Sequence, residues 1–352
     1  MLHRRQLLQN TLGALAAVSA SGLVGGLPTA SAYDEKQYER IVNGGCDWIA
    51  KTQSNSGGWT GAQSSYPTAM TALAGMALIC HGSTTTQGKY SGALRKCVDY
   101  LCAKSRSNGL IGDPKSDDRY TYGHGYAMMF LSQVLGEEED IQRRQELTEV
   151  LKASVKFCIQ AQTSSGGWGY VSAKEGGDFD EGSTTITQVQ GLRGCRNAGI
   201  PVPKEAIDKA IKYIQKCTLS DGGVQYSAKT GGGGRPPISA AAIACLYNAG
   251  DYDDKLVPKM LEYVKKHYQS VGSDNDGHWH YAHYYYAQVV YREGGKLWQE
   301  YRDKMYVRLM NEAKSDGKVH YWDQGYIGPI YTTSINLTIL QLEKAYLPLY
   351  QR

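Results

Sequence analysis

Two stretches of the chain, WIAKTQSNSGGW (residues 48–59) and FCIQAQTSSGGW (residues 157–168), align without a gap and end in the same Gly-Gly-Trp. A third stretch, YIQKCTLSDGGV (213–224), aligns with them, and weaker copies lie at residues 100–111, 273–279 and 311–319. Successive copies are mostly a little over fifty residues apart, so six units fill the chain after residue 32. Similarity at a fixed period is typical of repeat architectures.

Each unit predicts two kinds of helix. In EAIDKAIKYIQKC (205–217), Ile207, Ala210, Ile211 and Ile214 recur at helical spacing opposite lysines, which predicts an outer helix with one wet face. After the turns, YPTAMTALAGMALI (66–79), YGHGYAMMFLSQVL (122–135) and ISAAAIACLYNAG (238–250) lack a charged face, which predicts buried inner helices. We expect the inner helices to stop at glycines that can adopt a left-handed conformation: Gly82, Gly136, Gly199, Gly250 and Gly294.

Six buried helices alternate with six helices that expose one face to solvent, and few segments have the pattern of a strand. This organisation predicts an all-α fold. The simplest arrangement is an (α/α)6 toroid, in which the inner helices run parallel around one axis. Residues late in the connecting loops, or in the first turn of an inner helix, then line the mouth of a central funnel.

The Q-x3-G-G-W form of QSNSGGW (53–59) and QTSSGGW (162–168) resembles the repeat of the squalene cyclase and protein prenyltransferase β-subunit superfamily. The likeness covers the whole chain after residue 32 and implies the toroid fold without deciding the chemistry. We expect the repeated glutamines, Gln53 and Gln162, to cap backbone groups at the adjoining turn.

The stretch DFDE (178–181) lies shortly after Trp168 and before a predicted inner helix. It resembles the D-x-D-D motif of class II terpene cyclases, which implies that Asp180 is the general acid and that Asp178 and Glu181 are its neighbours. Crowded carboxylates cannot all ionise, so one of them can keep a proton near neutral pH. The motif departs from the family at its fourth position, where Glu181 replaces Asp, and two alternatives remain open: a cation or polar-ligand site, and an acidic helix cap.

Other polar residues predicted at the mouth favour a different ligand. The candidates for substrate binding are Tyr122, His124, Arg235, His280, His283, Tyr285 and Tyr331. A His, Tyr and Arg set can also abstract the proton α to a uronate carboxylate, as glycan lyases on helical toroids do. A non-catalytic binding scaffold is the third interpretation, so the sequence leaves open whether the protein is an enzyme.

No metal or cofactor is predicted. His283 is the nearest equivalent of the zinc-binding histidine of prenyltransferase β-subunits, but the Asp-x-Cys pair of that family has no match here. Most of the eight cysteines lie in apolar helical runs, where a thiol behaves as a small hydrophobe, so we expect free thiols rather than disulfides.

The N-terminus predicts export. Arg4 and Arg5 precede an apolar, small-residue run that ends in Ala-Ser-Ala, so residues 1–32 resemble a twin-arginine signal and residues 33–352 form the toroid domain. Without these two arginines, 36 Lys and Arg face 34 Asp and Glu, a balance that indicates no nucleic-acid partner. We expect a periplasmic or extracellular monomer that binds a small molecule or glycan and contacts a membrane only through an uncleaved signal.

Overall fold

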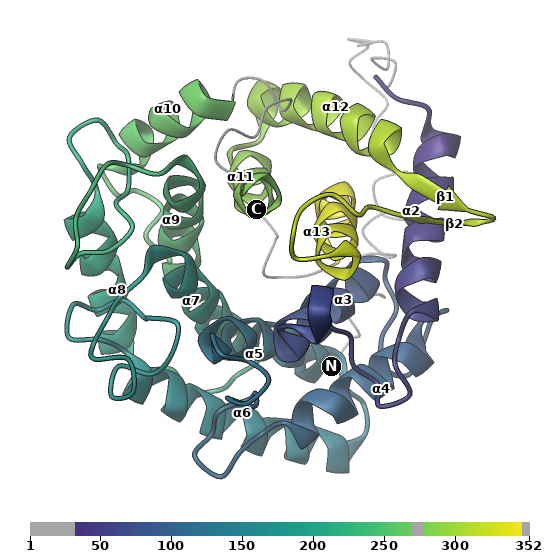
Figure 1. Ribbon diagram of the computed structural model, residues 1–352, viewed down its shortest axis with the longest axis horizontal. Helices are drawn as coiled ribbons and strands as arrows, with labels where there is room; N and C mark the ends of the chain where they lie inside the picture. The colour runs from purple at the N-terminus through teal and green to yellow at the C-terminus, as the bar shows by residue number, and fades with distance from the viewer. Residues whose placement is uncertain (1–31, 269–277, 347–352) are drawn as a thin grey trace, which may run out of the picture. The chain divides into compact units, whose positions relative to one another are not determined.

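Two concentric rings of α-helices make up the part of the chain that the computed structural model describes, residues 32–268 and 278–346 (Figure 1). The outer helices are α2 (Glu35–Lys51), α4 (Ser91–Ala103), α6 (Ile141–Ala161), α8 (Lys204–Cys217), α10 (Val257–Tyr268) and α12 (Gly295–Glu312). The inner helices are α3 (Pro67–Cys80), α5 (Tyr120–Glu137), α7 (Gly182–Asn197), α9 (Pro236–Ala249), α11 (Trp279–Glu293) and α13 (Pro329–Leu340). The predicted all-α (α/α)6 toroid is therefore confirmed.

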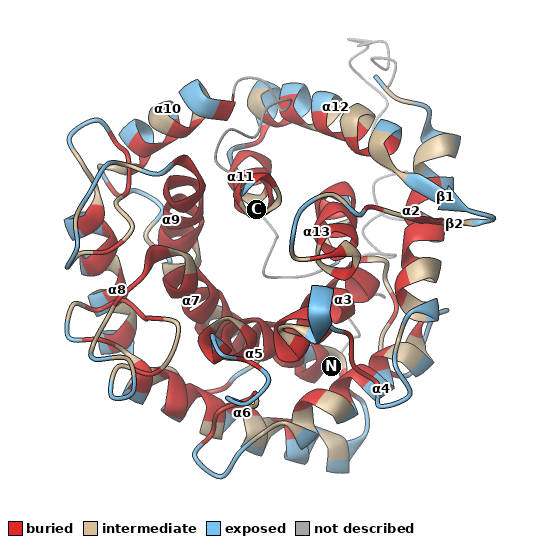
Figure 2. Ribbon diagram, viewed as in Figure 1, coloured by how far each residue is buried: buried red, intermediate tan, exposed pale blue. Residues whose placement is uncertain are grey.

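The inner ring is closed, because each inner helix contacts the next and α13 returns to α3. Burial follows the sequence pattern: the inner helices are buried almost throughout, whereas the outer helices bury one face (Figure 2). These helices belong to one compact unit, Tyr33–Arg352. The predicted signal, apart from Ala32, lies outside the described residues. None of the described helices is long and apolar enough to cross a membrane.

The repeated glutamine joins each intact turn to the following unit. Gln53 donates from Nε2 to the carbonyls of Gly57 (2.8 Å) and Ala93 (2.9 Å), the latter in α4. Gln162 makes the same pair of bonds to Gly166 (2.8 Å) and Ala206 (2.9 Å) in α8. The prediction that these glutamines cap backbone groups at the adjoining turn is confirmed.

The turn tryptophan is anchored from two sides. Trp59 donates its indole N–H to Ile49 O in α2 (3.0 Å) and its backbone N–H to Thr71 Oγ1 in α3 (2.9 Å). Trp168 repeats the pattern with Cys158 O and Thr185 Oγ1, and Trp322 repeats it with Leu309 O and Thr333 Oγ1. The third tryptophan with this pattern is Trp322, whereas Trp279 is the first residue of α11.

The sixth turn contains a short β-hairpin. β1 (Lys314–Asp316) and β2 (Val319–Tyr321) pair antiparallel, with Lys314 opposite Tyr321. This hairpin was not predicted, although its two-residue turn, Gly317-Lys318, has a glycine at the first central position, as type II′ turns do, and Gly317 has a φ of 63°.

Four of the five predicted stop glycines have positive φ: Gly82, Gly199, Gly250 and Gly294. The prediction is wrong for Gly136, because α5 continues through it to Glu137. Arg144 bonds the last carbonyls instead, donating from Nη1 to Leu135 O (3.2 Å) and Glu138 O (2.7 Å).

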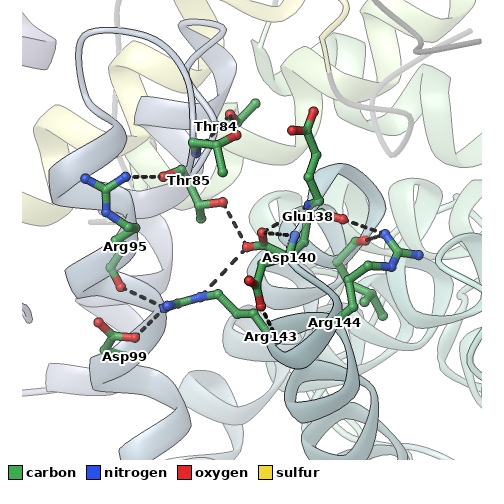
Figure 3. A network of polar contacts seen from close by, with 11 residues as sticks. Thr84, Thr85, Arg95, Asp99, Glu138, Asp140, Arg143 and Arg144 are labelled. Atoms are coloured by element: carbon green, nitrogen blue, oxygen red, sulfur yellow. Dashed lines mark hydrogen bonds and ion pairs between the residues drawn. The ribbon is translucent and has the colours of Figure 1, made fainter.

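The corner between α5 and α6 is also held by charge (Figure 3). Glu138 is buried, accepts a hydrogen bond from Thr85 Oγ1 (2.9 Å) and lies 3.8 Å from Arg143 Nε. Arg95 of α4 donates to Thr85 O (2.7 Å). This network ties α4 to the end of the inner ring at which α5 finishes, opposite the end at which the inner helices begin.

Gly166 of the Gly-Gly-Trp turn lies against the outer helix of the next unit, so we expect any side chain at this position to destabilise the fold. A Cβ on Gly166, whose φ is 96°, would lie 2.4 Å from Lys209 O of α8. We expect Gly166→Ala to lower the free energy of unfolding by about 2–4 kcal/mol, since it adds a clash to left-handed strain. Urea denaturation of the purified protein measures this.

The matched control is Gly177→Ala in the same loop. Gly177 also has positive φ (60°), but its added Cβ would meet no atom within 4 Å. We expect this variant to lose only about 1 kcal/mol, from backbone strain alone. Equal losses in both variants would show that the close approach to Lys209 does not matter.

Candidate functional site

The starts of the inner helices meet at one cavity of about 590 Å³. The residue immediately before the helix lines this cavity for five of the six inner helices: Tyr66, Arg119, Glu181, Arg235 and His278. Because helix N-termini carry partial positive charge, the converging ends create a positive potential there. The cavity lies where the sequence predicted the mouth of a funnel.

Tyrosine dominates the lining. Eight tyrosines among the described residues line the cavity: Tyr66, Tyr122, Tyr126, Tyr170, Tyr226, Tyr281, Tyr326 and Tyr331. Burial raises the pKa of Tyr122, Tyr281 and Tyr331. These phenols therefore stay neutral near pH 7 and offer ring faces and hydrogen bonds, but they are poor general bases.

Glu181 brings the only carboxylate among the described lining residues. It is the N-cap of α7: Oε1 accepts from Ser183 N (3.0 Å), and Oε2 accepts from Thr184 N (3.0 Å) and Ser183 Oγ (2.5 Å). Tyr122 lies 3.4 Å from the same Oε2 and hydrogen-bonds to the Ser183 hydroxyl. Glu181 is 1% exposed, and burial raises the pKa of its carboxyl although these hydrogen bonds oppose the rise.

The Gly-Gly-Trp turn positions this glutamate. Glu181 N donates to Trp168 O (2.9 Å), and Thr184 Oγ1 donates to the same carbonyl (2.6 Å). Thr185, which accepts the Trp168 N–H, donates from its hydroxyl to Glu181 O (3.0 Å). The repeat motif therefore fixes the residue that reaches the cavity.

Asp180, the predicted acid, does not line the cavity. It is buried behind the loop, where Oδ1 accepts from Tyr213 OH (3.1 Å) and Ala228 N (2.7 Å) and Oδ2 accepts from Ser165 Oγ (2.8 Å). Tyr213 belongs to α8 and Ala228 to the loop that follows α8, whereas Ser165 lies in the Gly-Gly-Trp turn of the same unit as Asp180. Asp180 therefore holds two units together.

Asp178 also contacts the next unit, but at the surface. Its Oδ2 lies 2.5 Å from Lys229 Nζ, and Ser164 donates to the same carboxylate. The Lys229 ammonium and Ser164 lower the pKa of Asp178 to about 2. The stretch 178–181 thus combines two inter-unit contacts with one cavity residue.

The predicted substrate-binding residues are divided by the structure. Tyr122, Arg235 and Tyr331 line the cavity. Tyr285 lies one layer behind, where its hydroxyl contacts that of Tyr126 (3.1 Å). His280 is not part of the lining and stacks edge-on against Trp279.

The two remaining histidines occupy positions of the repeat. His124 accepts from Ile111 N at Nδ1 (3.1 Å), the bond that Thr71 and Thr185 make in other units. It is buried, and burial lowers its pKa to about 4. His283 lies at the matching position of α11 and bonds Tyr301 OH (3.0 Å). Neither lines the cavity.

Several cavity residues were not anticipated: Tyr66, Arg119, Tyr126, Tyr170, Ser183, Tyr226 and Tyr281. Most lie within one turn of an inner-helix start or in the loop before it. They could have been predicted by aligning the six units at the first residue of each predicted inner helix.

Few side chains among the described residues are suited to bind a metal ion or to take part in redox chemistry. Among them, no group of three or more His, Cys, Asp and Glu side chains could hold a metal ion. All eight cysteines are free thiols, and burial raises the pKa of Cys80 and Cys195 to about 12, so these thiols stay protonated.

The sequence matches the prenyltransferase alpha-alpha toroid domain family over residues 17–179 and 192–281. No curated protein sequence matches the chain. At this level of sequence divergence, similarity to solved structures concerns the fold alone.

Three solved structures illustrate that similarity. An inactive variant of the alpha-1,6-mannanase GH76A of Salegentibacter sp. HEL1_6, in complex with alpha-1,6-mannotriose, has a TM-score of 0.63 at 8% identity over 88% of this chain and 99% of that chain. A D-mannose isomerase has a TM-score of 0.59 at 10% identity over 89% and 99%. The type II terpene cyclase MstE_D109N from Scytonema has a TM-score of 0.34 at 14% identity over 89% and 98%.

The two aspartates should differ in stability. We expect Asp180→Ala to cost about 2–4 kcal/mol, because it leaves the buried Ala228 N–H and Tyr213 hydroxyl without their acceptor. Asp180→Asn keeps one acceptor and should cost about 1 kcal/mol. Asp178→Asn should cost less than about 1 kcal/mol, since its ion pair is exposed.

Urea denaturation at pH 7 and pH 3 measures these losses. The depressed pKa of Asp178 means that its contribution is present above pH 4 and is lost as pH falls toward 2. An Asp180→Ala variant as stable as the parent would contradict the inter-unit role of Asp180.

The raised pKa of Glu181 predicts the opposite pH dependence. Its contribution to stability is complete below the unfolded pKa and is lost as pH rises through the folded pKa. Glu181→Gln does not titrate but loses part of the helix cap, worth about 1 kcal/mol. Melting curves from pH 4 to pH 9 should therefore show the variant less stable in acid and the difference shrinking or reversing in base. A constant difference would mean that folding does not shift the pKa of Glu181.

Proposed function

The chain belongs to the prenyltransferase alpha-alpha toroid family, and from this premise we propose that it is an exported protein whose cavity binds a polyhydroxylated, glycan-like ligand. Glu181 is the proposed proton donor to that ligand. The observation that carries the proposal is the lining: eight tyrosines, two arginines and one buried glutamate surround the cavity.

Tyrosine suits a sugar ligand for two reasons. Its ring face packs against the apolar face of a sugar ring, and its hydroxyl bonds to sugar hydroxyls. Tyr66, Tyr170, Tyr226 and Tyr281 are each partly exposed at the cavity, so both features are accessible there. Two solved proteins of similar fold, an alpha-1,6-mannanase in complex with alpha-1,6-mannotriose and a D-mannose isomerase, indicate that sugar ligands are compatible with such a ring.

The number of carboxylates that line the cavity argues against ordinary glycoside hydrolysis. That reaction generally needs two carboxylates on either side of the scissile bond. Glu181 is the single carboxylate among the described lining residues. Its raised pKa suits a group that keeps and donates a proton, with Tyr122 and Ser183 holding the carboxyl in place.

Acid-initiated terpenoid cyclisation is the second candidate. The cavity also has apolar lining residues, Ala69, Met70 and Leu73 of α3 and Ile238 of α9, which share it with the buried acid. A cyclase of this kind would use Glu181 in place of Asp180, because the Asp180 carboxylate lies behind the loop.

Calorimetric titration of the full chain with matched panels of neutral oligosaccharides, acidic oligosaccharides and polyprenyl compounds tests the proposal. We expect an oligosaccharide to bind, and Tyr281→Phe to weaken that binding about 5–10-fold through loss of one hydroxyl. Tyr252→Phe is the control, since its phenol bonds Arg193 beyond the C-terminal end of α9, away from the cavity.

The outcomes separate the candidates. Binding of polyprenyl compounds without any oligosaccharide would contradict the glycan proposal and favour the cyclase. If Glu181 donates a proton, Glu181→Gln should abolish turnover of a bound ligand while leaving its affinity within a few fold. Turnover that survives this substitution would exclude Glu181 as the donor.

A further inference from the structure

Two arginines occupy positions that helix stability disfavours. Arg119 and Arg235 are the N-cap residues of α5 and α9, and neither side chain caps its helix. A cation at the positive end of a helix dipole is unfavourable, and acidic or small polar residues normally take this position. A residue that disfavours the helix it begins is typical of a functional site.

Neither guanidinium group is neutralised by a partner. Both side chains line the cavity and are exposed, and neither forms an ion pair with any of the described residues. Burial by itself lowers the pKa of Arg119, but Tyr170, Tyr66, Tyr122 and the charge of Asp118 together raise it, and none of them forms an ion pair with Arg119. Two free cations therefore share the cavity with the positive ends of the inner helices.

Tyrosine rings hold the two arginines in place. Arg119 Cζ lies 4.3 Å from the ring centroid of Tyr170, and Arg235 Cζ lies 4.5 Å from that of Tyr226. The hydroxyls of Tyr170 and Tyr226 hydrogen-bond to each other. These four residues form what we term the arginine–tyrosine array. Stacking occupies the face of a guanidinium group and leaves its in-plane N–H donors for a ligand.

The backbone fixes the array across three successive units. Tyr170 O accepts from Thr121 N of α5 (3.1 Å), and Tyr226 O accepts from Gly182 N of α7 (3.0 Å). Arg235 N donates to Val224 O (3.0 Å). The array is therefore organised before any ligand arrives, which lowers the entropic cost of binding.

We propose that the arginine–tyrosine array binds the carboxylates of an acidic glycan, so that the ligand is a uronate oligosaccharide. This inference rests on the proposed glycan function and specifies its substrate class. Guanidinium groups bind carboxylates through paired hydrogen bonds, and the two rings between them can pack against sugar rings. Charges at the two ends of a ring pair suit a ligand with repeated carboxylates better than one compact diphosphate, and no lysine is present among the described lining residues.

The test compares each uronate oligosaccharide with its carboxyl-reduced, neutral counterpart by calorimetry on the full chain. The panel contains galacturonate, glucuronate and mannuronate oligomers. We expect at least one acidic oligomer to bind more tightly than its neutral partner. Arg119→Gln and Arg235→Gln should each weaken acidic binding about tenfold and together about a hundredfold, while neutral binding changes less than about threefold.

Arg196→Gln is the matched control, because it removes the same charge from the last turn of α7, at the opposite end of the ring. The melting temperatures of the two array variants should equal or exceed that of the parent, since each removes a cation from a helix N-terminus. This readout separates a loss of binding from a loss of folding.

Each remaining outcome is decisive. Equal affinity for acidic and neutral oligomers, or acidic binding that survives both substitutions, would overturn the uronate inference and leave the glycan proposal standing. Binding of no oligosaccharide, acidic or neutral, would overturn both. Binding of an isoprenyl diphosphate that requires Arg119 and Arg235, without oligosaccharide binding, would assign the array to a different anion.

Discussion

The close approach of a turn glycine to the next outer helix, seen at four turns among the described residues, is the constraint on which the ring depends. A Cβ on Gly57, Gly109, Gly166 or Gly222 would lie between 2.2 and 2.4 Å from a carbonyl oxygen of the following outer helix. All four glycines have φ near 90°, which disfavours other residues independently of space. Because this contact recurs at four turns, each of these turns is held against the following outer helix, which limits how far the inner helices between them can change their tilt or direction.

Parallel inner helices follow from that contact, and the cavity follows from the parallel helices. When all six begin at the same end, the residue before the helix faces a common space at five of them, whatever its chemical type. The scaffold is therefore built from the repeated Gln, Gly and Trp, whereas the site is built from positions that differ between units. This separation explains how one ring can hold chemically different sites.

The sequence predicted the scaffold better than the site, for a physical reason. Helical periodicity and the spacing of the turns depend on local and repeated interactions, so the six units, the two rings and the roles of Gln53 and Gln162 could be predicted. The loops between turn and inner helix vary in length, and the consecutive residues Asp180 and Glu181 face opposite ways, so the sequence could not show which of the two reaches the cavity. His124 takes a place held by threonine elsewhere, and this equivalence appears only in the shared hydrogen bond to the turn backbone.

The two proposed features of the cavity influence each other electrostatically. Helix N-termini and arginines favour the ionised form of a nearby carboxyl, whereas burial disfavours it, and for Glu181 burial prevails. A uronate carboxylate bound to the arginine–tyrosine array would offset the positive charge and place a like charge in the same cavity as Glu181. Both effects raise the pKa of Glu181 further. The proposed ligand, once bound, would thus favour the protonated form of the proposed proton donor.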